Sequence, residues 1–221
     1  MSEPGRRTDP AARGVVVVNA GIGNLGAIPN MLKRLGTAAN VTGDANEIAS
    51  ADRIILPGVG AFDAAMQSLA DLGLIAVLNR KALEERVPIL GVCLGMELLG
   101  AGSEEGRLPG LGWIKGHTVR FRSNDGGPLL RVPHMGWNYV RPTTNDALFA
   151  ELGTSPRFYF AHSYHFVCDE EADVAGVTRY GQPFVSAVHR GNISGIQFHP
   201  EKSHRFGLQV FRNFLAGLVD E

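Results

Sequence analysis

The sequence has little cysteine, no excess charge of one sign and no long apolar run, and each absence narrows the possible class of protein. Two cysteines in 221 residues, Cys93 and Cys168, are too few for a disulfide scaffold and indicate a reducing compartment. The net charge of −1 gives no basic field for nucleic acid or an anionic membrane. No segment approaches the roughly 20 apolar residues of a membrane span, and residues 1–13 lack the apolar core of a signal peptide. We therefore expect a cytoplasmic protein with a disordered tail, residues 1–13, and one globular domain, residues 14–221.

Metal and cofactor signals are also scarce. His162 and His165 stand three apart in a strand-like run without further ligands, so we interpret them as structural and expect no metal. Residues 21–26 have the spacing G-x-G-x-x-G of a dinucleotide fingerprint, and Asp44 follows at about the expected distance. Pro29 in the early helix and the lack of a clear strand ending at Asp44 count against this alternative. We otherwise expect no cofactor.

Apolar periodicity predicts an α/β fold. Short β-branched runs typical of buried parallel strands alternate with helix-like stretches up to about residue 100. These strands are expected at 14–19, 51–56 and the run before Cys93, and the helices at 27–35 and 63–86. Beyond residue 100 we expect mostly antiparallel strands, at 157–167, 173–180, 184–189 and 193–198, before a last helix near 206–219. The pattern predicts an open, mostly parallel sheet flanked by helices, with antiparallel strands in the C-terminal half.

Residues 88–99 carry the strongest chemical signal. A short apolar run reaches Cys93, which is flanked by Gly91 and Gly95 and followed by a helix-like stretch. This pattern is the thiol form of a nucleophile elbow, a sharp strand-to-helix turn whose glycines let neighbouring backbone pack closely. The helix N-terminus beside the sulfur is expected to lower the pKa of the thiol and favour the thiolate. The plainer alternative is a cysteine that packs as a small buried hydrophobe.

A histidine and a carboxylate near the C-terminus complete a possible catalytic set. His199 and Glu201 are two apart, which places both side chains on one side of an extended chain. A thiol nucleophile needs a base near neutral pH, and that base needs an acceptor that orients it. The loop at 57–62 follows the second strand and contains two glycines, so its backbone N–H groups could face a negative charge. An ordinary strand-to-helix connection is the alternative for this loop.

Two segments together resemble the signature stretches of class I (triad) glutamine amidotransferases, namely Gly91–Met96 and Gln197–Ser203. Three further stretches, Pro57–Phe62, Val132–Asn138 and Tyr159–Tyr164, are similar to the HisH glutaminase subunits of imidazole glycerol phosphate synthase. The resemblance implies a flavodoxin-like amidotransferase fold from about residue 14 to the C-terminus. Gly23-Asn24-Leu25 fits the same subunits, which weakens the dinucleotide hypothesis.

The resemblance also implies the chemistry. Cys93 would attack the side-chain amide of L-glutamine, His199 would serve as base and then acid, and Glu201 would orient His199. The other implied roles are an oxyanion hole at Val59, Gly60 and Leu94, substrate contacts at Gly58, Glu97, Ser163 and Tyr164, and partner contacts at Asn24 and Lys202.

The implied partner is a HisF-like (β/α)₈ cyclase, joined as a heterodimer, with no role for nucleic acid or membrane. The ammonia released from glutamine would pass to this cyclase, which forms imidazole glycerol phosphate and AICAR in histidine biosynthesis.

Departures from the family keep two further alternatives open. Glu97 stands where the family usually has glutamine, and Asn19-Ala20-Gly21 stands where it usually has Asp-Tyr-Gly. Residues 26–33 and 202–207 also resemble a paralogous branch that supplies ammonia for amidation of a surface sugar. A non-catalytic subunit is the other alternative, which Glu97 favours and the intact set of Cys93, His199 and Glu201 opposes.

Overall fold

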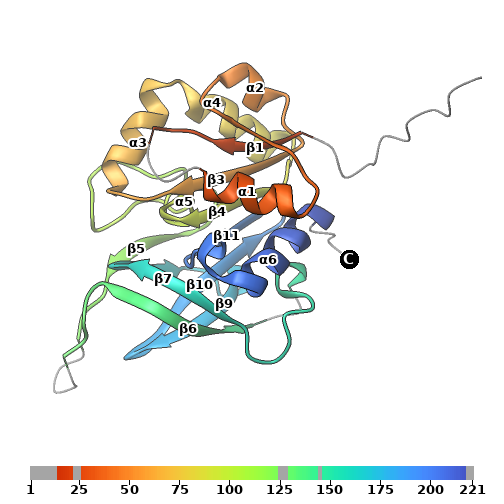
Figure 1. Ribbon diagram of the computed structural model, residues 1–221. Coiled ribbons are helices and arrows are strands. Elements are labelled where there is room, and N and C mark those ends of the chain that lie inside the picture. The colour runs from red at the N-terminus through yellow and green to blue at the C-terminus, as the bar shows by residue number, and fades with distance from the viewer. Residues whose placement is uncertain (1–13, 22–25, 124–128, 144–145, 218–221) are drawn as a thin grey trace, which may run out of the picture.

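The computed structural model describes residues 14–21, 26–123, 129–143 and 146–217 (Figure 1). The expected tail at 1–13 and Asn24 lie outside the described residues. The first half contains β1 (Val15–Val18), α1 (Ala27–Arg34), β2 (Ala39–Thr42), α2 (Ala45–Ala49), β3 (Arg53–Gly58), α3 (Phe62–Asp71), α4 (Leu74–Asn79), the π-helix η2 (Arg80–Glu84), β4 (Ile89–Cys93) and α5 (Leu94–Glu97). The second half contains β5 (Gly116–Arg120), β6 (His134–Pro142), η3 (Ala147–Phe149), β7 (Arg157–His162), β8 (Tyr164–Cys168), η4 (Glu171–Asp173), β9 (Val174–Tyr180), β10 (Gln182–Arg190), β11 (Ile193–Ile196), η5 (Pro200–Lys202) and α6 (His204–Ala216).

The strands form one mixed sheet with a parallel half and an antiparallel half. The strand order is β2-β1-β3-β4-β11-β10-β9-β6-β7, and β5 joins through β8, which pairs with β10. Strands β2, β1, β3, β4 and β11 pair in parallel, whereas the pairings between strands beyond β11 in the described residues are antiparallel. The predicted combination of a parallel sheet and C-terminal antiparallel strands is confirmed.

Helices cover both faces of the parallel half because its strands are apolar on both sides. On one face, Val16, Val18 and Leu56 pack with buried side chains of α2, α3 and α4. On the other face, Val15 and Val17 pack with α1 and with buried side chains of α6. Figure 1 shows α1 and α6 lying together on their face of the sheet. This double cover leaves the strand ends as the accessible part of the sheet.

The structure differs from the sequence predictions at two strands. β2 ends at Thr42, so a strand does precede Asp44, and the expectation that none does is wrong. β2 is an edge strand with a largely exposed Asn40-Val41 centre, which gives no apolar period. The strand predicted at 157–167 breaks at Ser163 into β7, which pairs with β6, and β8, which pairs with β5 and β10. Both pieces have strand composition, so the break has no signal in the local pattern.

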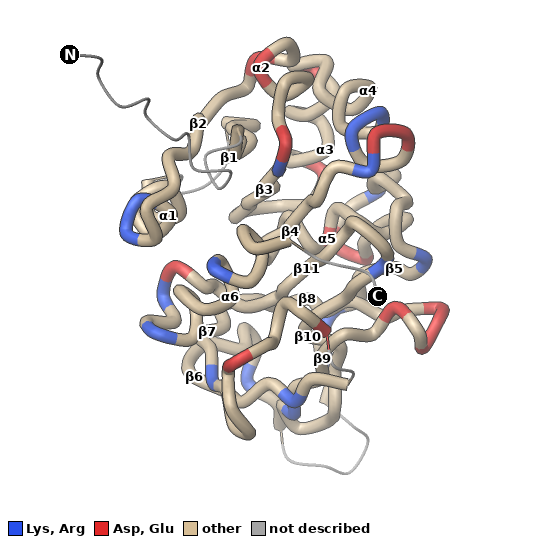
Figure 2. The backbone as a smooth tube through the Cα atoms, turned by 90° about the vertical axis from the view of Figure 1, so that its right-hand side faces the viewer, with Lys and Arg blue, Asp and Glu red and all other residues tan. Residues whose placement is uncertain are grey.

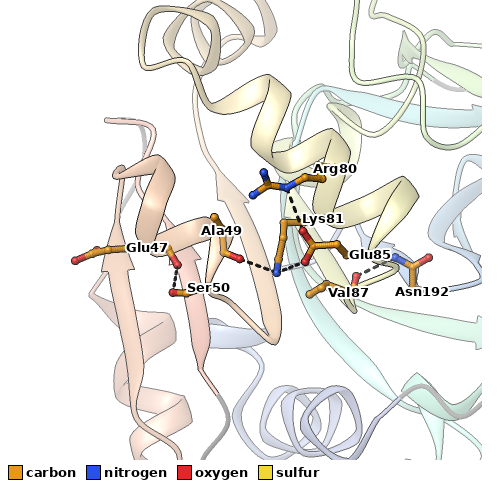
Figure 3. Close-up of polar contacts among 8 residues, drawn as sticks. All are labelled: Glu47, Ala49, Ser50, Arg80, Lys81, Glu85, Val87 and Asn192. Carbon is orange, nitrogen blue, oxygen red and sulfur yellow. Dashed lines mark hydrogen bonds and ion pairs between the residues drawn. The ribbon is translucent and has the colours of Figure 1, made fainter.

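A buried cation joins helices behind the parallel half (Figure 3). Lys81 lies in η2 and is 4% exposed. Its Nζ donates to the carbonyl oxygen of Ala49, at the C-terminal end of α2, and to Glu85 Oε2 at 2.9 and 2.6 Å. Arg80 Nε lies 3.1 Å from the other oxygen of Glu85. A buried cation at a helix C-terminus is stabilised by the helix dipole, so these contacts fix α2 against η2.

Charged residues of both signs are interspersed along the described chain (Figure 2). Figure 2 shows both signs distributed around the chain rather than gathered on one element. Among the described residues, no helix combines the length and the apolar character needed to cross a bilayer.

Candidate active site

Cys93 occupies the sharp turn predicted from the sequence. It ends β4 and precedes α5 directly, with φ 55° and ψ −111°, a backbone conformation that non-glycine residues rarely adopt. A Cβ added at Gly95 would lie 1.7 Å from the carbonyl oxygen of Leu56, and one at Gly91 would lie 2.6 Å from that of Gly95. The prediction that the two glycines permit close backbone packing is therefore confirmed.

The protonation state of the thiol differs from the sequence prediction. Burial raises the pKa of the Cys93 thiol far above its ordinary value, and the nearby carboxyl of Glu97 raises it further. The backbone N–H of Leu94 acts in the opposite direction, as expected of a helix N-terminus, but α5 is only four residues long. The predicted lowering of the pKa is wrong because burial outweighs the effect of the short helix. Cys93 rests as a thiol and needs a base to become a nucleophile.

His199 and Glu201 form the expected pair. His199 Nδ1 lies 2.8 Å from Glu201 Oε1, with 5% and 12% of the two side chains exposed. A carboxylate oxygen accepts a hydrogen bond, so Nδ1 carries the proton and Nε2 is left as the acceptor. The backbone N–H of His199 donates to the carbonyl oxygen of Tyr159 at 2.8 Å, and Ser203 Oγ donates to the carbonyl oxygen of His199 at 2.6 Å. These two bonds hold the backbone of His199 at its N–H and at its carbonyl oxygen, and so position the imidazole.

Parallel register brings this pair to the cysteine. Ile196 at the end of β11 pairs with Val92 of β4. The C-terminal ends of these two parallel strands therefore lie side by side. Gln197 follows Ile196, and its Nε2 lies 4.0 Å from Cys93 Sγ. The carboxyl of Glu201 also acts on the pKa of Cys93 and raises it. Cys93 and the His199–Glu201 pair, which are separated by more than 100 residues of sequence, therefore share one site.

A cavity of about 210 Å³ opens beside Cys93. This volume is below the roughly 300–1,000 Å³ of typical ligand pockets, so it fits an amino acid better than a dinucleotide. Its lining includes most of the predicted substrate and oxyanion residues, namely Val59, Gly60, Cys93, Leu94, Glu97, Ser163 and Tyr164. Gly58 is not in the lining, because it packs behind the cavity where a Cβ would come 2.9 Å from Leu94 Cβ. Five lining residues were not predicted, namely Glu105, Pro133, Met135, Ala161 and His162.

Two carboxyl groups face this cavity from different elements. Glu97 is 5% exposed, and its Oε1 accepts a hydrogen bond from Gln197 Nε2 at 2.8 Å. Burial raises the pKa of Glu97 to about 8, with a further contribution from the charge of Glu105, while the bond from Gln197 opposes the shift. Glu105 Oε2 accepts from the backbone N–H of Phe62 at the start of α3 at 2.8 Å. No lysine or arginine is among the described lining residues.

His162 is held neutral by its neighbours. Its Nδ1 lies 2.6 Å from the carbonyl oxygen of Tyr164, which can only accept, so Nδ1 carries the proton. Its Nε2 lies 2.9 Å from His134 Nδ1 and therefore accepts from that ring. Burial lowers the pKa of His162 to about 3 and that of His134 to about 4. In the described residues no group of three His, Cys, Asp or Glu side chains could hold a metal ion.

The remaining predicted residues lie away from the cavity. Lys202 is in η5 with its Nζ 5.5 Å above the ring of Tyr159. Asp44 caps α2, where its Oδ1 accepts from the backbone N–H groups of Asn46 and Glu47 at 2.8 and 3.0 Å. The carboxylate expected to bind a ribose is thus already used within the fold.

Comparisons with known proteins agree with this geometry. A family model for class I glutamine amidotransferases matches residues 16–218. "Imidazole glycerol phosphate synthase subunit HisH 2" of Methanococcus maripaludis is 46% identical over 201 residues, which cover 91% of this chain and 98% of the relative. The protein of the same name from Pseudomonas aeruginosa is 47% identical over the same shares. Among solved structures, PurLQS from Thermotoga maritima has a TM-score of 0.70 at 22% identity, covering 94% of this chain and 100% of that chain, and shows the fold alone.

Proposed function

We propose that this chain, which belongs to the class I glutamine amidotransferase family and, within it, to the HisH subunits of imidazole glycerol phosphate synthase, hydrolyses L-glutamine and delivers the ammonia to a cyclase partner. The observation that carries this proposal is the meeting of Cys93, on its strained turn, with the hydrogen-bonded His199–Glu201 pair at one edge of the sheet. The small cavity beside the thiol supplies room for the amino acid.

The first half of the reaction forms a thioester. His199 Nε2 takes the proton of the Cys93 thiol, and the sulfur attacks the side-chain amide carbon of glutamine. Glu201 stabilises the imidazolium that results. The C–N bond then breaks as His199 returns its proton to the leaving nitrogen, which departs as ammonia. In the second half of the reaction, water attacks the thioester with His199 again as the base, and glutamate leaves.

The developing oxyanion needs N–H donors at the Cys93 end of the cavity. The backbone N–H of Leu94 already acts on the sulfur, and Val59 and Gly60 line the facing wall. Gly60 has φ +119°, so its peptide groups can take orientations closed to other residues. Each such donor is typically worth about 3 kcal/mol of transition-state stabilisation.

An apolar surface beside the cavity fits a protein partner. Met135, Trp137 and Tyr139 alternate along β6 and are 64%, 43% and 59% exposed. Met135 also lines the cavity, so a partner covering this strand would cover the site as well. Large exposed aromatic and methionine side chains are typical centres of interfaces. We propose a (β/α)₈ cyclase as this partner, in a heterodimer that forms imidazole glycerol phosphate and AICAR.

Ammonia release from L-glutamine tests the reaction. We expect weak release by the chain alone, strong release with a cyclase partner carrying its ligand, and none from Cys93→Ala in either state. Trp137→Ala should lower the stimulation by the partner while the partner-free rate stays unchanged. Absence of release in every mixture, with glutamine analogues also unbound, would overturn the assignment.

A second candidate acceptor for the ammonia is a surface sugar. The observation that favours this candidate is the resemblance of residues 26–33 and 202–207 to a paralogous branch that serves sugar amidation. Titrating the chain with a cyclase barrel and with a sugar amidotransferase, each measured by stimulated ammonia release, distinguishes the two acceptors. We also propose a cytoplasmic location, which the two free cysteines, Cys93 and Cys168, support.

A further inference from the structure

The ionisable groups that line the cavity include acids but no lysine or arginine among the described residues. Two carboxyl groups, those of Glu97 and Glu105, line it. Glu105 accepts a hydrogen bond from the backbone N–H of Phe62 at the N-terminus of α3, which holds its carboxyl group at the cavity. Glutamine has a cationic α-ammonium and an anionic α-carboxylate, and only the ammonium complements two acids. The cavity therefore presents a site for a cation before any substrate enters.

Glu97 differs from Glu105 in its environment. It lies one helical turn after Cys93 and is almost completely buried. Gln197 donates to its Oε1, and no described residue donates to Oε2 or forms an ion pair with this carboxyl. A buried carboxyl without a cation is stable in its neutral form, because desolvation disfavours the charge. The ammonium of a ligand is the partner that would make ionisation favourable.

We propose that the Glu97 carboxyl group binds the α-ammonium group of glutamine and that, on this binding, Glu97 releases its own proton to solvent. Before a ligand binds, Glu97 is the neutral acid, with Glu105 in the same cavity lining. When the ammonium enters, the Glu97 carboxyl ionises, one proton passes to the buffer, and the carboxylate pairs with the ligand cation. Glu97 is thus a specificity-determining residue for the α-amino end of the substrate. This inference rests on the proposed glutaminase function.

The other ionisable groups around the cavity do not supply this proton. His162 donates from Nδ1 to a carbonyl oxygen and accepts at Nε2, so it has no proton to lose near neutral pH. Cys93 rests as a thiol, and its substitution removes it from the measurement. Tyr164 is also in the lining, whereas His199, just before η5, and Glu201, within η5, are not. Of the charges around it, Glu105 is the one that acts on Glu97.

Calorimetric binding of L-glutamine to Cys93→Ala tests the proposal without turnover. Titrations in buffers of different ionisation enthalpy count the protons released. A carboxyl with a pKa of about 8 in the empty site should release about 0.9 protons at pH 7 and about 0.5 at pH 8. By the same linkage, the affinity for L-glutamine should be about fivefold higher at pH 8 than at pH 7.

The Cys93→Ala/Glu97→Gln double variant should bind glutamine with no proton release and with an affinity independent of pH from 6 to 8. Cys93→Ala/Glu171→Gln, with an exposed carboxyl outside the cavity, is the matched control and should behave like Cys93→Ala. 4-Aminobutanamide, which lacks the α-carboxylate, should still release a proton on binding. 4-Carbamoylbutanoate, which lacks the α-ammonium, should release none.

The outcomes separate this proposal from the glutaminase assignment. Glutamine binding without proton release at pH 7, or release that persists in the Glu97→Gln background, overturns the role of Glu97 and leaves the glutaminase intact. If native protein neither binds glutamine nor forms ammonia with a partner present, the function itself fails. Circular dichroism of the double variant checks its fold, and the amide oxygen that Glu97→Gln introduces can still accept the bond from Gln197.

Discussion

The parallel and antiparallel halves of the sheet contribute different parts of the site. The parallel half supplies the reacting groups, because β3, β4 and β11 end together and lead into Gly60, Cys93 and His199. The antiparallel half supplies the wall that faces them, with His162 at the end of β7 and Met135 on β6. The reacting half is closely packed on both faces, whereas β6 exposes one face. The comparison teaches that the chemistry lies where backbone packing is tightest, and recognition lies where side chains remain accessible.

The largest effect should come from the nucleophile in the parallel half. Cys93→Ala should lower glutaminase kcat/KM by about 10⁴-fold or more, measured as ammonia release with the partner present. Cys93→Gly should be equally inactive but more stable than Cys93→Ala by roughly 1–2 kcal/mol, because glycine relieves the positive φ at this turn. Equal free energies of unfolding for the two variants would show that the turn is unstrained.

The next effect tests the difference in packing between the halves. Gly95→Ala places a Cβ 1.7 Å from the carbonyl oxygen of Leu56 and should cost about 3 kcal/mol of unfolding free energy or prevent folding. The matched change is Gly153→Ala, before β7, where φ is +73° and no atom lies within 4 Å. That variant should lose only roughly 1–2 kcal/mol from the backbone conformation. Similar losses in urea unfolding would refute the difference.

Acid should act mainly on the antiparallel half. His134 and His162 are held neutral, with pKa values of about 4 and about 3, while the unfolded chain binds protons below about 6.5. The unfolded state therefore binds more protons as pH falls below 6.5, and stability decreases, by at most about 1.4 kcal/mol per pH unit for each ring. His134→Gln should reduce this slope between pH 6 and pH 4.5. The exposed His117 is the control, and an unchanged slope in His134→Gln would contradict the assignment.

The smallest expected effect is a loss of stability at α2, which follows the edge strand β2 of the parallel half. Asp44→Ala removes the cap of α2 and should cost about 1 kcal/mol of stability, with no change in ammonia release. Asp44→Asn keeps the capping oxygen and should cost less. A loss of activity without a loss of stability would restore a ligand-binding role for Asp44.

The buried strands and the cysteine turn of the parallel half were predictable because their signals are local, whereas its exposed edge strand β2 gave no signal. Short β-branched runs and the glycines on either side of Cys93 specify buried strands and a tight turn without reference to distant residues. The His199–Glu201 spacing likewise indicates a pair, and the structure shows the bond. The role of Glu97 was visible only as an unusual residue, because its environment depends on β11 and on Glu105.

The antiparallel half was less predictable because its contacts join distant segments. The stacking of His134 against Tyr180, at 4.0 Å between ring centroids, and its bond to His162 arise from pairing between β6, β7 and β9. The net pKa of Cys93 also depends on the volume of protein that covers it rather than on the sequence around the turn. Neither periodicity nor motif spacing reports these quantities.

A short bridge joins Tyr159 of β7 to His199, which lies three residues after the end of β11. Trp137 pairs with Tyr159 across the β6–β7 ladder, and Tyr159 in turn accepts from the backbone N–H of His199. Ser203 Oγ ties the same loop from the other side by donating to His199 and accepting from Tyr159. The exposed β6 strand is therefore connected to the backbone of His199 by one ladder pairing and one hydrogen bond. The strands that form the outer part of the antiparallel half thus also hold the histidine in place beside the cavity.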